Sequence, residues 1–110
     1  MARTLINMPG SARRGDVIEI RTLIAHPMET GLRPGADGKV LPQNLIRRFT
    51  CHYDDGGGKA LVFSAELFPA IAANPYFAFH MAATASGTLS FVWEGDNGFA
   101  QTETVAFKVT

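Results

Sequence analysis

Apolar and polar residues alternate with a period of two along most of the chain, which is the pattern of β-strands. The clearest example is the segment 16–26, where both sets of alternate positions are partly apolar. One set is Ile18, Ile20, Thr22 and Ile24, and the other is Val17, Glu19, Arg21 and Leu23. We therefore expect this segment to be a central strand with neighbours on both sides.

The same alternation predicts five further strands, at 46–53, 61–67, 76–83, 89–93 and 105–109. Their expected core-facing residues are Phe49, Cys51 and Tyr53; Leu61, Phe63, Ala65 and Leu67; Phe77, Phe79, Met81 and Ala83; Leu89, Phe91 and Trp93; and Val105, Phe107 and Val109. In the segment 46–53, the alternation places Ile46 on the opposite face, with Arg48, Thr50 and His52.

Turn residues separate these segments and suggest how they connect. The stretch 54–58, Asp-Asp-Gly-Gly-Gly, predicts a hairpin between the strands of Cys51 and Phe63, and Asp-Asn-Gly at 96–98 predicts another turn. About seven short strands separated by such turns are typical of an all-β fold, an immunoglobulin-like antiparallel sandwich of two sheets. We expect one domain, residues 1–110.

Two segments depart from the strand pattern. Residues 68–75 have Pro69 and Pro75 near their ends and an alanine-rich centre, so we expect a short helical turn that crosses between the sheets. Residues 31–38 contain three glycines and Pro34 and form the longest expected loop.

Composition narrows the range of functions. The 110 residues are 46% hydrophobic with eight Phe, enough for a core without disulfides, and ten basic residues balance ten acidic ones. No net field attracts nucleic acid or an anionic membrane, so we expect neither as a partner. The apolar run at 5–8 is too short for a signal peptide, so we expect synthesis in the cytoplasm without an export signal of its own.

Cys51 is the one candidate nucleophile. It alternates in phase with Phe49 and Tyr53, so we interpret it as a buried structural thiol rather than a reactive one. His52, its neighbour, projects to the opposite face of a strand and cannot activate it there. A redox or sulfur-transfer domain that uses Cys51 stays open as an alternative function.

Other catalytic and cofactor patterns are weak. His26, His52 and His80 lack metal-ligand spacing, so we predict no metal site. The glycines 56–58 lack the Lys-Ser/Thr ending of a phosphate-binding loop, and no pair of carboxylates is placed together by the periodicity. We therefore expect no catalytic residues and no cofactor.

The loop 26–31 follows the most apolar strand and has the sequence His26, Pro27, Met28, Glu29, Thr30 and Gly31. Pro27 favours extended backbone at His26 and ends regular strand pairing. Two interpretations remain open from the residues alone: a loop that ends a strand, or a recognition loop held by a rigid scaffold.

Several separated motifs together resemble the SoxZ family, the small subunits of the SoxYZ sulfur carriers of bacterial thiosulfate oxidation. They are HPMETG at 26–31, FTC at 49–51, FSAELFPAI at 63–71, ANP at 73–75 and GTLSFVW at 87–93. The resemblance covers nearly the whole chain in order and spacing, which makes it more specific than any single motif.

The resemblance implies a non-catalytic immunoglobulin-like subunit that forms a heterodimer with SoxY. In this family SoxY carries the sulfur intermediate on a cysteine of a flexible C-terminal arm, whereas this chain ends in the alternating segment 105–110. Cys51 stands mid-strand, so the resemblance does not transfer the carrier role to it. Export to the periplasm together with SoxY, whose signal would serve both chains, is also implied.

The expected SoxY-binding residues fall in two groups. The first is the loop His26, Pro27, Met28, Glu29, Thr30 and Gly31. The second comprises outward positions of two-sided strands: Val17, Leu23, Tyr76, Ala78 and His80. Enzymes of thiosulfate oxidation are expected as transient partners, and the isolated chain is expected to self-associate through its partner surface or an unpaired edge strand. A generic immunoglobulin-like interaction module is the remaining alternative.

Overall fold

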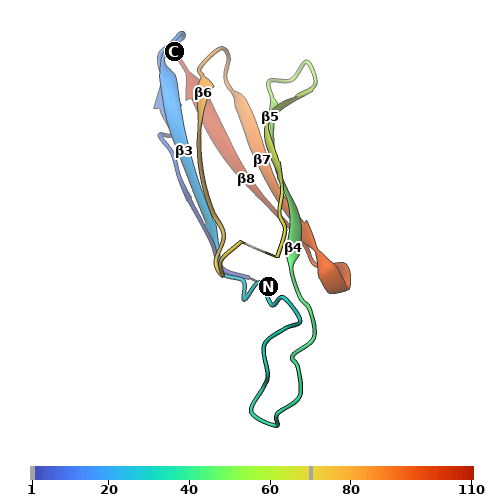
Figure 1. Cartoon of the computed structure of the whole chain (residues 1–110). Helices are drawn as coiled ribbons and strands as arrows, with labels where there is room; N and C mark the ends of the chain where they lie inside the picture. Colours follow the sequence, from blue (N-terminus) through green and yellow to red (C-terminus); the bar gives the residue numbers. More distant parts are fainter. Residues whose placement is uncertain (1, 70) are drawn as a thin grey trace.

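The computed structural model describes residues 2–69 and 71–110 and contains eight strands and one 3₁₀ turn (Figure 1). The elements are β1 (Thr4–Asn7), β2 (Ser11–Ala12), β3 (Val17–Ile24), β4 (Ile46–Asp54), β5 (Lys59–Glu66), β6 (Tyr76–Ala82), β7 (Gly87–Gly95), η1 (Asp96–Gly98) and β8 (Ala100–Val109). The predicted all-β class is confirmed.

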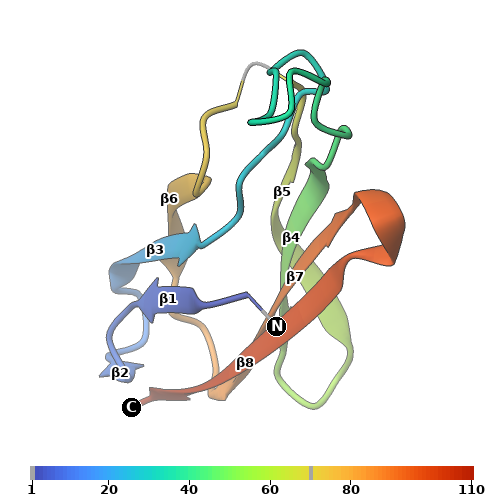
Figure 2. The ribbon, with the colours of Figure 1, turned by 90° about the horizontal axis from the view of Figure 1, so that it is seen from below.

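The strands form two sheets that face each other, as Figure 2 shows. The narrow sheet has the order β1-β3-β6 and the wide sheet the order β2-β8-β7-β4-β5. All pairs are antiparallel except the short pair of β2 with β8. β3 lies at the centre of the narrow sheet, as its two-sided apolar pattern predicted.

The core fills the space between the inner faces of the sheets. Its largest fully buried side chains are Trp93, Phe49, Phe91, Ile20, Ile24, Leu45, Ile46 and Leu89. Phe49 of β4 stacks on Phe77 of β6, with ring centroids 5.0 Å apart and planes 3° apart, and Phe63 of β5 stacks on Phe79 at 4.6 Å. These aromatic pairs join the two sheets across the sandwich.

Two residues depart from the predicted faces because β-bulges change the phase of their strands. Arg47 is an extra residue of β4 opposite β7, so Ile46 turns inward and is buried, contrary to the prediction. Val62 is an extra residue of β5 opposite β4, so Leu61 faces solvent with 58% of its surface exposed. The expectation that Leu61 lies in the core was therefore wrong.

The predicted connections are present. Residues 54–58 join β4 to β5 in a hairpin, and η1 joins β7 to β8. The segment 67–75 crosses from the wide sheet to the narrow one, and its described part has one i to i+3 hydrogen bond, from Ile71 N to Phe68 O, at 3.0 Å. This is a single turn rather than a helix, and Ala70 lies outside the described residues.

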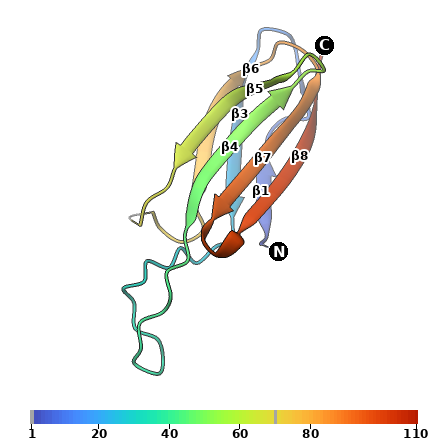
Figure 3. The same ribbon diagram turned by 90° about the vertical axis from the view of Figure 1, so that its right-hand side faces the viewer.

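The connection from β3 to β4 is the longest in the chain and extends beyond the sandwich as an arm (Figures 1 and 3). Isolated bridges between Glu29 and Asn44 and between Pro34 and Val40 hold its two sides together. The arm helps to give the molecule extents of 57 × 21 × 21 Å. The predicted loop 31–38 forms its outer half. Within the described residues, no helix is long and apolar enough to span a membrane.

Gly95 ends β7 against the backbone at the start of β4, and this close approach generates a prediction. A Cβ at Gly95 would overlap the Leu45 carbonyl oxygen, whereas a Cβ at Gly10 would meet no heavy atom within 4 Å. We expect Gly95→Ala to lower the free energy of unfolding by about 1–3 kcal/mol because the backbones must separate. Gly10→Ala is the control, with a change below about 1 kcal/mol. Urea denaturation measures both, and equal stabilities would contradict the packing described.

Candidate functional site

The outer face of the narrow sheet carries an apolar row that crosses all three strands. Leu5 lies opposite Leu23, and Leu23 lies opposite Tyr76. Leu5 is 62% exposed and Tyr76 is 55% exposed, and a groove of about 200 Å³ is lined by the row together with Asn7, Arg21 and Thr22. Val17, at the other end of β3, is 67% exposed. Large apolar residues gathered on one exposed face are a feature of interaction surfaces.

Polar residues border this apolar row along β3 and β6. Arg21 Nε donates to Glu19 Oε1 at 2.7 Å, and His80 Nε2 lies 3.9 Å from Glu19 Oε2. Ala78 lies opposite Arg21 and offers no side chain beyond its methyl group. The face therefore has an apolar band beside a charged one, which resembles the division of an interface into an apolar centre and a polar rim.

The outer face of the wide sheet differs sharply in chemistry. Its cross-strand rows pair Ser64 with Thr50, Thr50 with Val92 and Val92 with Thr102, and the next row contains Leu61, His52, Ser90 and Thr104. Hydroxyl-bearing and charged residues are frequent on this surface, and Leu61, 58% exposed, lies at its β5 edge. Of the two outer faces, the narrow sheet's face is the better candidate for covering by a partner.

The loop 26–31 is fixed at its root by His26, which is buried although polar. Its backbone N donates to Asn74 Oδ1 at 2.9 Å, and Asn74 N donates to the His26 carbonyl at 2.8 Å. The ring Nδ1 accepts from Met28 N at 3.0 Å, and the ring packs edge-on against Phe99. Desolvation by burial lowers the pKa of His26, with the carboxylate of Asp96 opposing that shift.

Met28 adopts a left-handed backbone conformation, with φ of +50°, and its side chain is buried. Its sulfur accepts a hydrogen bond from Ile46 N at 3.3 Å, across the root of the arm. A non-glycine residue in this region costs energy, which the buried contacts of Met28 offset. The buried side chain of Met28 therefore ties the loop to the start of β4.

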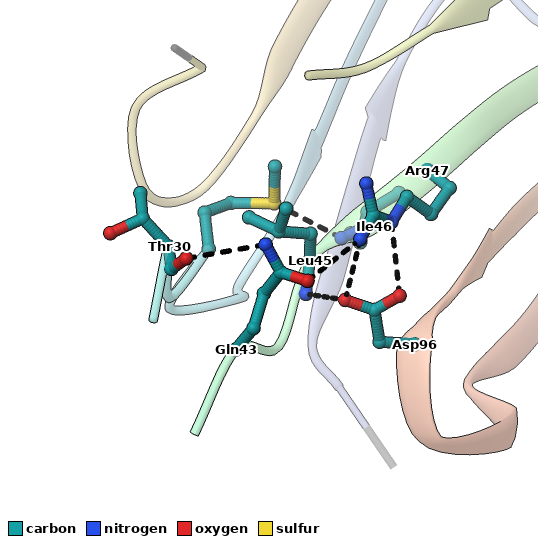
Figure 4. Close-up of polar contacts among 7 residues, drawn as sticks. Thr30, Gln43, Leu45, Ile46, Arg47 and Asp96 are labelled. Carbon is teal, nitrogen blue, oxygen red and sulfur yellow. Dashed lines mark hydrogen bonds and ion pairs between the residues drawn. The ribbon is translucent and has the colours of Figure 1, made fainter. Parts of the chain in front are cut away.

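Asp96 joins the second side of the arm to the turn after β7, as Figure 4 shows. Its carboxylate accepts from Leu45 N at 3.0 Å and from Arg47 Nε at 2.9 Å, and Arg47 Nη2 donates to Gln43 Oε1 at 2.9 Å. Gln43 Nε2 in turn donates to the Thr30 carbonyl at 3.2 Å. The hydrogen bond from Arg47 is the main reason that the pKa of Asp96 is lowered.

A groove of about 460 Å³ lies where the arm leaves the sandwich, lined by Pro27, Met28, Glu29, Thr30, Arg33 and Ala73. Glu29 and Arg33 form an ion pair with each other, and the hydrogen bond from Arg33 lowers the pKa of Glu29. Because this pair is already neutralised, the groove offers no free charge from these two residues to a ligand.

Cys51 is completely buried in the core on β4, opposite Phe63 and Phe91. Desolvation raises the pKa of its thiol to about 12, so the reactive thiolate is scarce near neutral pH. Across residues 2–69 and 71–110, no group of three His, Cys, Asp or Glu side chains is placed to hold a metal ion.

The structure separates the predicted partner-binding residues into accessible and inaccessible sets. Tyr76, Ala78 and His80 are exposed on one face of β6, and Val17 is exposed on β3. Leu23, Glu29, Thr30 and Gly31 are partly buried and Pro27 is exposed, whereas His26 and Met28 are buried and shape the loop from inside.

Sequence reasoning missed Leu5, Asn74 and Asp96. Leu5 lies on a strand of only four residues, too short for alternation to identify. Asn74 precedes a proline and Asp96 begins a turn, and both were interpreted only as parts of connections. No local signal indicates that these two side chains bond to residues about 50 positions away.

The environment of His26 predicts a pH dependence of stability. The folded chain favours neutral imidazole, whereas the unfolded chain has the ordinary pKa of about 6.5. Unfolding in acid therefore takes up a proton, so we expect the free energy of unfolding to be largest above that pH and to fall as the pH drops below it. His26→Leu should lose this dependence, and it should cost about 1–3 kcal/mol at pH 7.5 because Met28 N loses its acceptor.

The measurements for His26 are urea denaturation at a series of pH values and NMR titration of the ring. His80→Gln is the control, since His80 is exposed and its replacement should leave the pH dependence intact. A His26 pKa at or above the ordinary value would contradict the buried, neutral ring.

Burial of Cys51 predicts slow alkylation. A rise in the thiol pKa from 9.0 to about 12 lowers the thiolate fraction at pH 8 by about a thousandfold. We expect the native chain to react with iodoacetamide far more slowly than the chain in urea. A Cys51→Ala/Ser64→Cys variant, with its thiol on the exposed edge strand, is the control and should react quickly. Equal rates for the native thiol and this control would identify Cys51 as accessible.

Comparison with solved structures shows a shared fold at low sequence identity. Superoxide reductase (neelaredoxin) from Ignicoccus hospitalis is 17% identical over 99% of this chain and 82% of its own, with a TM-score of 0.78. A putative superoxide reductase from Thermotoga maritima is 14% identical over 97% and 85%, with a TM-score of 0.76. The sulfur carrier protein SoxY from Chlorobium limicola f thiosulfatophilum is 15% identical over 97% and 78%, with a TM-score of 0.68.

These likenesses establish the sandwich and nothing about chemistry, since one fold hosts many functions. Among curated proteins, none matches this sequence. The family comparison is more specific: the family described as sulphur oxidation protein SoxZ matches residues 6–106, which is nearly the whole chain, and confirms the predicted resemblance. This chain therefore belongs to the SoxZ family of sulfur-oxidation proteins.

Proposed function

We propose that this protein is the non-catalytic half of a heterodimeric sulfur carrier and that it pairs with a SoxY subunit. The observation that carries the proposal is the exposed row Leu5, Leu23 and Tyr76 on a member of the SoxZ family. The SoxY cysteine arm would hold the sulfur intermediate, and this chain would supply the rigid base from which that arm works.

The state of Cys51 supports a non-catalytic role. A sulfur carrier needs a thiolate that reaches its substrate, whereas this thiol is enclosed by the core and has a raised pKa. The alternative function, thiol chemistry at Cys51, would require the sandwich to open.

The contrast between the two outer faces supports the choice of surface. A permanent heterodimer buries about 2,000 Å² or more, with an apolar centre. The row alone is too small for this, so the proposed interface continues along β6 over Ala78 and His80 and reaches the loop 26–31 at one end of the sheet. The hydroxyl-rich face of the wide sheet would remain in water.

A rigid SoxZ-family subunit and the flexible C-terminal arm of SoxY would together explain how one carrier serves several enzymes. Because this SoxY arm tethers the reactive sulfur to the complex, the sulfur stays at a high effective concentration near the docking sites of the complex. The hydrogen bonds of His26 and Asp96 would keep the end of the platform in one shape while enzymes of thiosulfate oxidation bind transiently. We further propose that the complex works in the periplasm, reached by export together with SoxY.

The surface assignment predicts that a charge at Leu5 prevents assembly. We expect the wild-type chain to co-elute with its cognate SoxY after coexpression, and Leu5→Glu to weaken the complex by at least about tenfold because a carboxylate would be buried without a partner. Thr104→Glu, on the outer face of the wide sheet, is the matched control and should assemble normally. Size-exclusion chromatography and titration calorimetry measure both.

Two results would contradict the proposal at different levels. Separate elution of the wild-type chain and SoxY would remove the pairing itself. Equal weakening by Leu5→Glu and Thr104→Glu, with both variants folded, would leave the pairing but place it elsewhere on the sandwich.

A further inference from the structure

The strand β5 forms one margin of the wide sheet, and only β4 pairs with it among the described residues. Figure 3 shows its free side at the edge of the sandwich, away from β1. Between Lys59 and Glu66 the strand has no charge, no proline and no glycine. Natural edge strands are normally blunted by charges, prolines or bulges. The six residues 60–65 carry no charge and no proline, and the bulge at Val62 sets the phase of the charged ends, so this edge is suited to pairing with a strand of matching charge pattern.

The bulge at Val62 gives this edge a specific charge pattern. Lys59 and Glu66 are seven positions apart, so in a regular strand they would project to opposite faces. The extra residue shifts the phase, and both project to the outer face, Lys59 beside Asp54 and Glu66 beside Arg48 of β4. Neither Lys59 nor Glu66 makes an ion pair within residues 2–69 and 71–110.

We propose that β5 pairs antiparallel with β5 of a second copy of this chain, about a two-fold axis between Val62 and Phe63. In this register Lys59 lies opposite Glu66 of the second copy, Ala60 opposite its Ala65 and Leu61 opposite its Ser64. The two wide sheets become one continuous sheet across the dimer.

Charge complementarity favours this register. The outer row would contain Asp54 and Lys59 of one copy followed by Glu66 and Arg48 of the other, so the signs alternate without a break. The two-fold axis repeats this row, giving two new ion pairs, and opposite charges directly across an antiparallel pair are stabilising. A parallel arrangement in register would instead place Lys59 opposite the second copy's Lys59 and Glu66 opposite its Glu66.

This dimer is independent of the proposed SoxY surface. β5 belongs to the wide sheet, whereas Leu5, Leu23 and Tyr76 lie on the outer face of the narrow sheet. The edge therefore stays free when the narrow sheet is covered, and failure of one assembly does not predict failure of the other. One pair of edge strands buries less area than a standard interface, so we expect a dimer that forms at high protein concentration.

The test uses two variants of the full chain, Lys59→Glu and Glu66→Lys. Each one alone places like charges opposite each other twice in the dimer, and we expect its self-association to weaken by about tenfold or more. In an equimolar mixture, the Lys59→Glu chain has acidic residues at both positions and the Glu66→Lys chain has basic residues at both. A dimer of one copy of each therefore contains two attractive pairs. We expect the mixture to recover the dimerisation of the wild type, measured by sedimentation velocity from micromolar to millimolar concentration.

Controls separate charge complementarity from general effects. Lys39→Glu changes the net charge as much as Lys59→Glu but lies on the arm, so it should dimerise as the wild type does. Circular dichroism and thermal melting confirm that each variant is folded. If a charge variant does not fold, Leu61→Lys at the exposed centre of the strand provides the second test and should also weaken the dimer.

A wild-type chain that stays monomeric at millimolar concentration would overturn the proposal. So would charge variants that associate as strongly as the wild type, or folded variants whose mixture shows no recovery. Recovery confined to the mixture would establish both the strand and its antiparallel register.

Discussion

The stacking of Phe49 on Phe77 is the contact on which the arrangement of this sandwich depends, because it joins the wide sheet to the narrow one across the core. Phe49 also lies 5.1 Å from Trp93, centroid to centroid, so one side chain links three strands in two sheets. Both inner faces are occupied by this packing. The outer faces, the edges and the connections are what remain for contacts with other molecules.

The same core encloses the cysteine of this member of a sulfur-oxidation family. Cys51 lies two residues after Phe49 on β4, so both side chains face the core. A thiolate there would lose its hydration without gaining a cation, which raises the thiol pKa. The fold thus uses the cysteine as a small apolar side chain, and the reactive sulfur of the proposed carrier would be on the partner.

The alternation of residues predicted most of the strands and their buried faces, because a period of two is a local property of an extended chain. Predictions failed where the phase changed. Ile46 and Leu61 lie beside bulges at Arg47 and Val62, and a bulge depends on how many residues the neighbouring strand presents. The candidate site was predicted in part: Tyr76 was identified from its strand, but the row with Leu5 was not, since the register of β1 against β3 brings them together.

By itself, the sequence determined the all-β class, the hairpin after β4, the inward position of Cys51 and membership in the SoxZ family. Each of these depends on residues close together along the chain or on several motifs in a fixed order. The tertiary structure decided the anchoring of His26 by Asn74, the bonds of Asp96 to the arm and the shared face of Lys59 and Glu66. Those features arise from contacts between distant segments, whose geometry is fixed only when two sheets pack and their bulges set the phase of each strand.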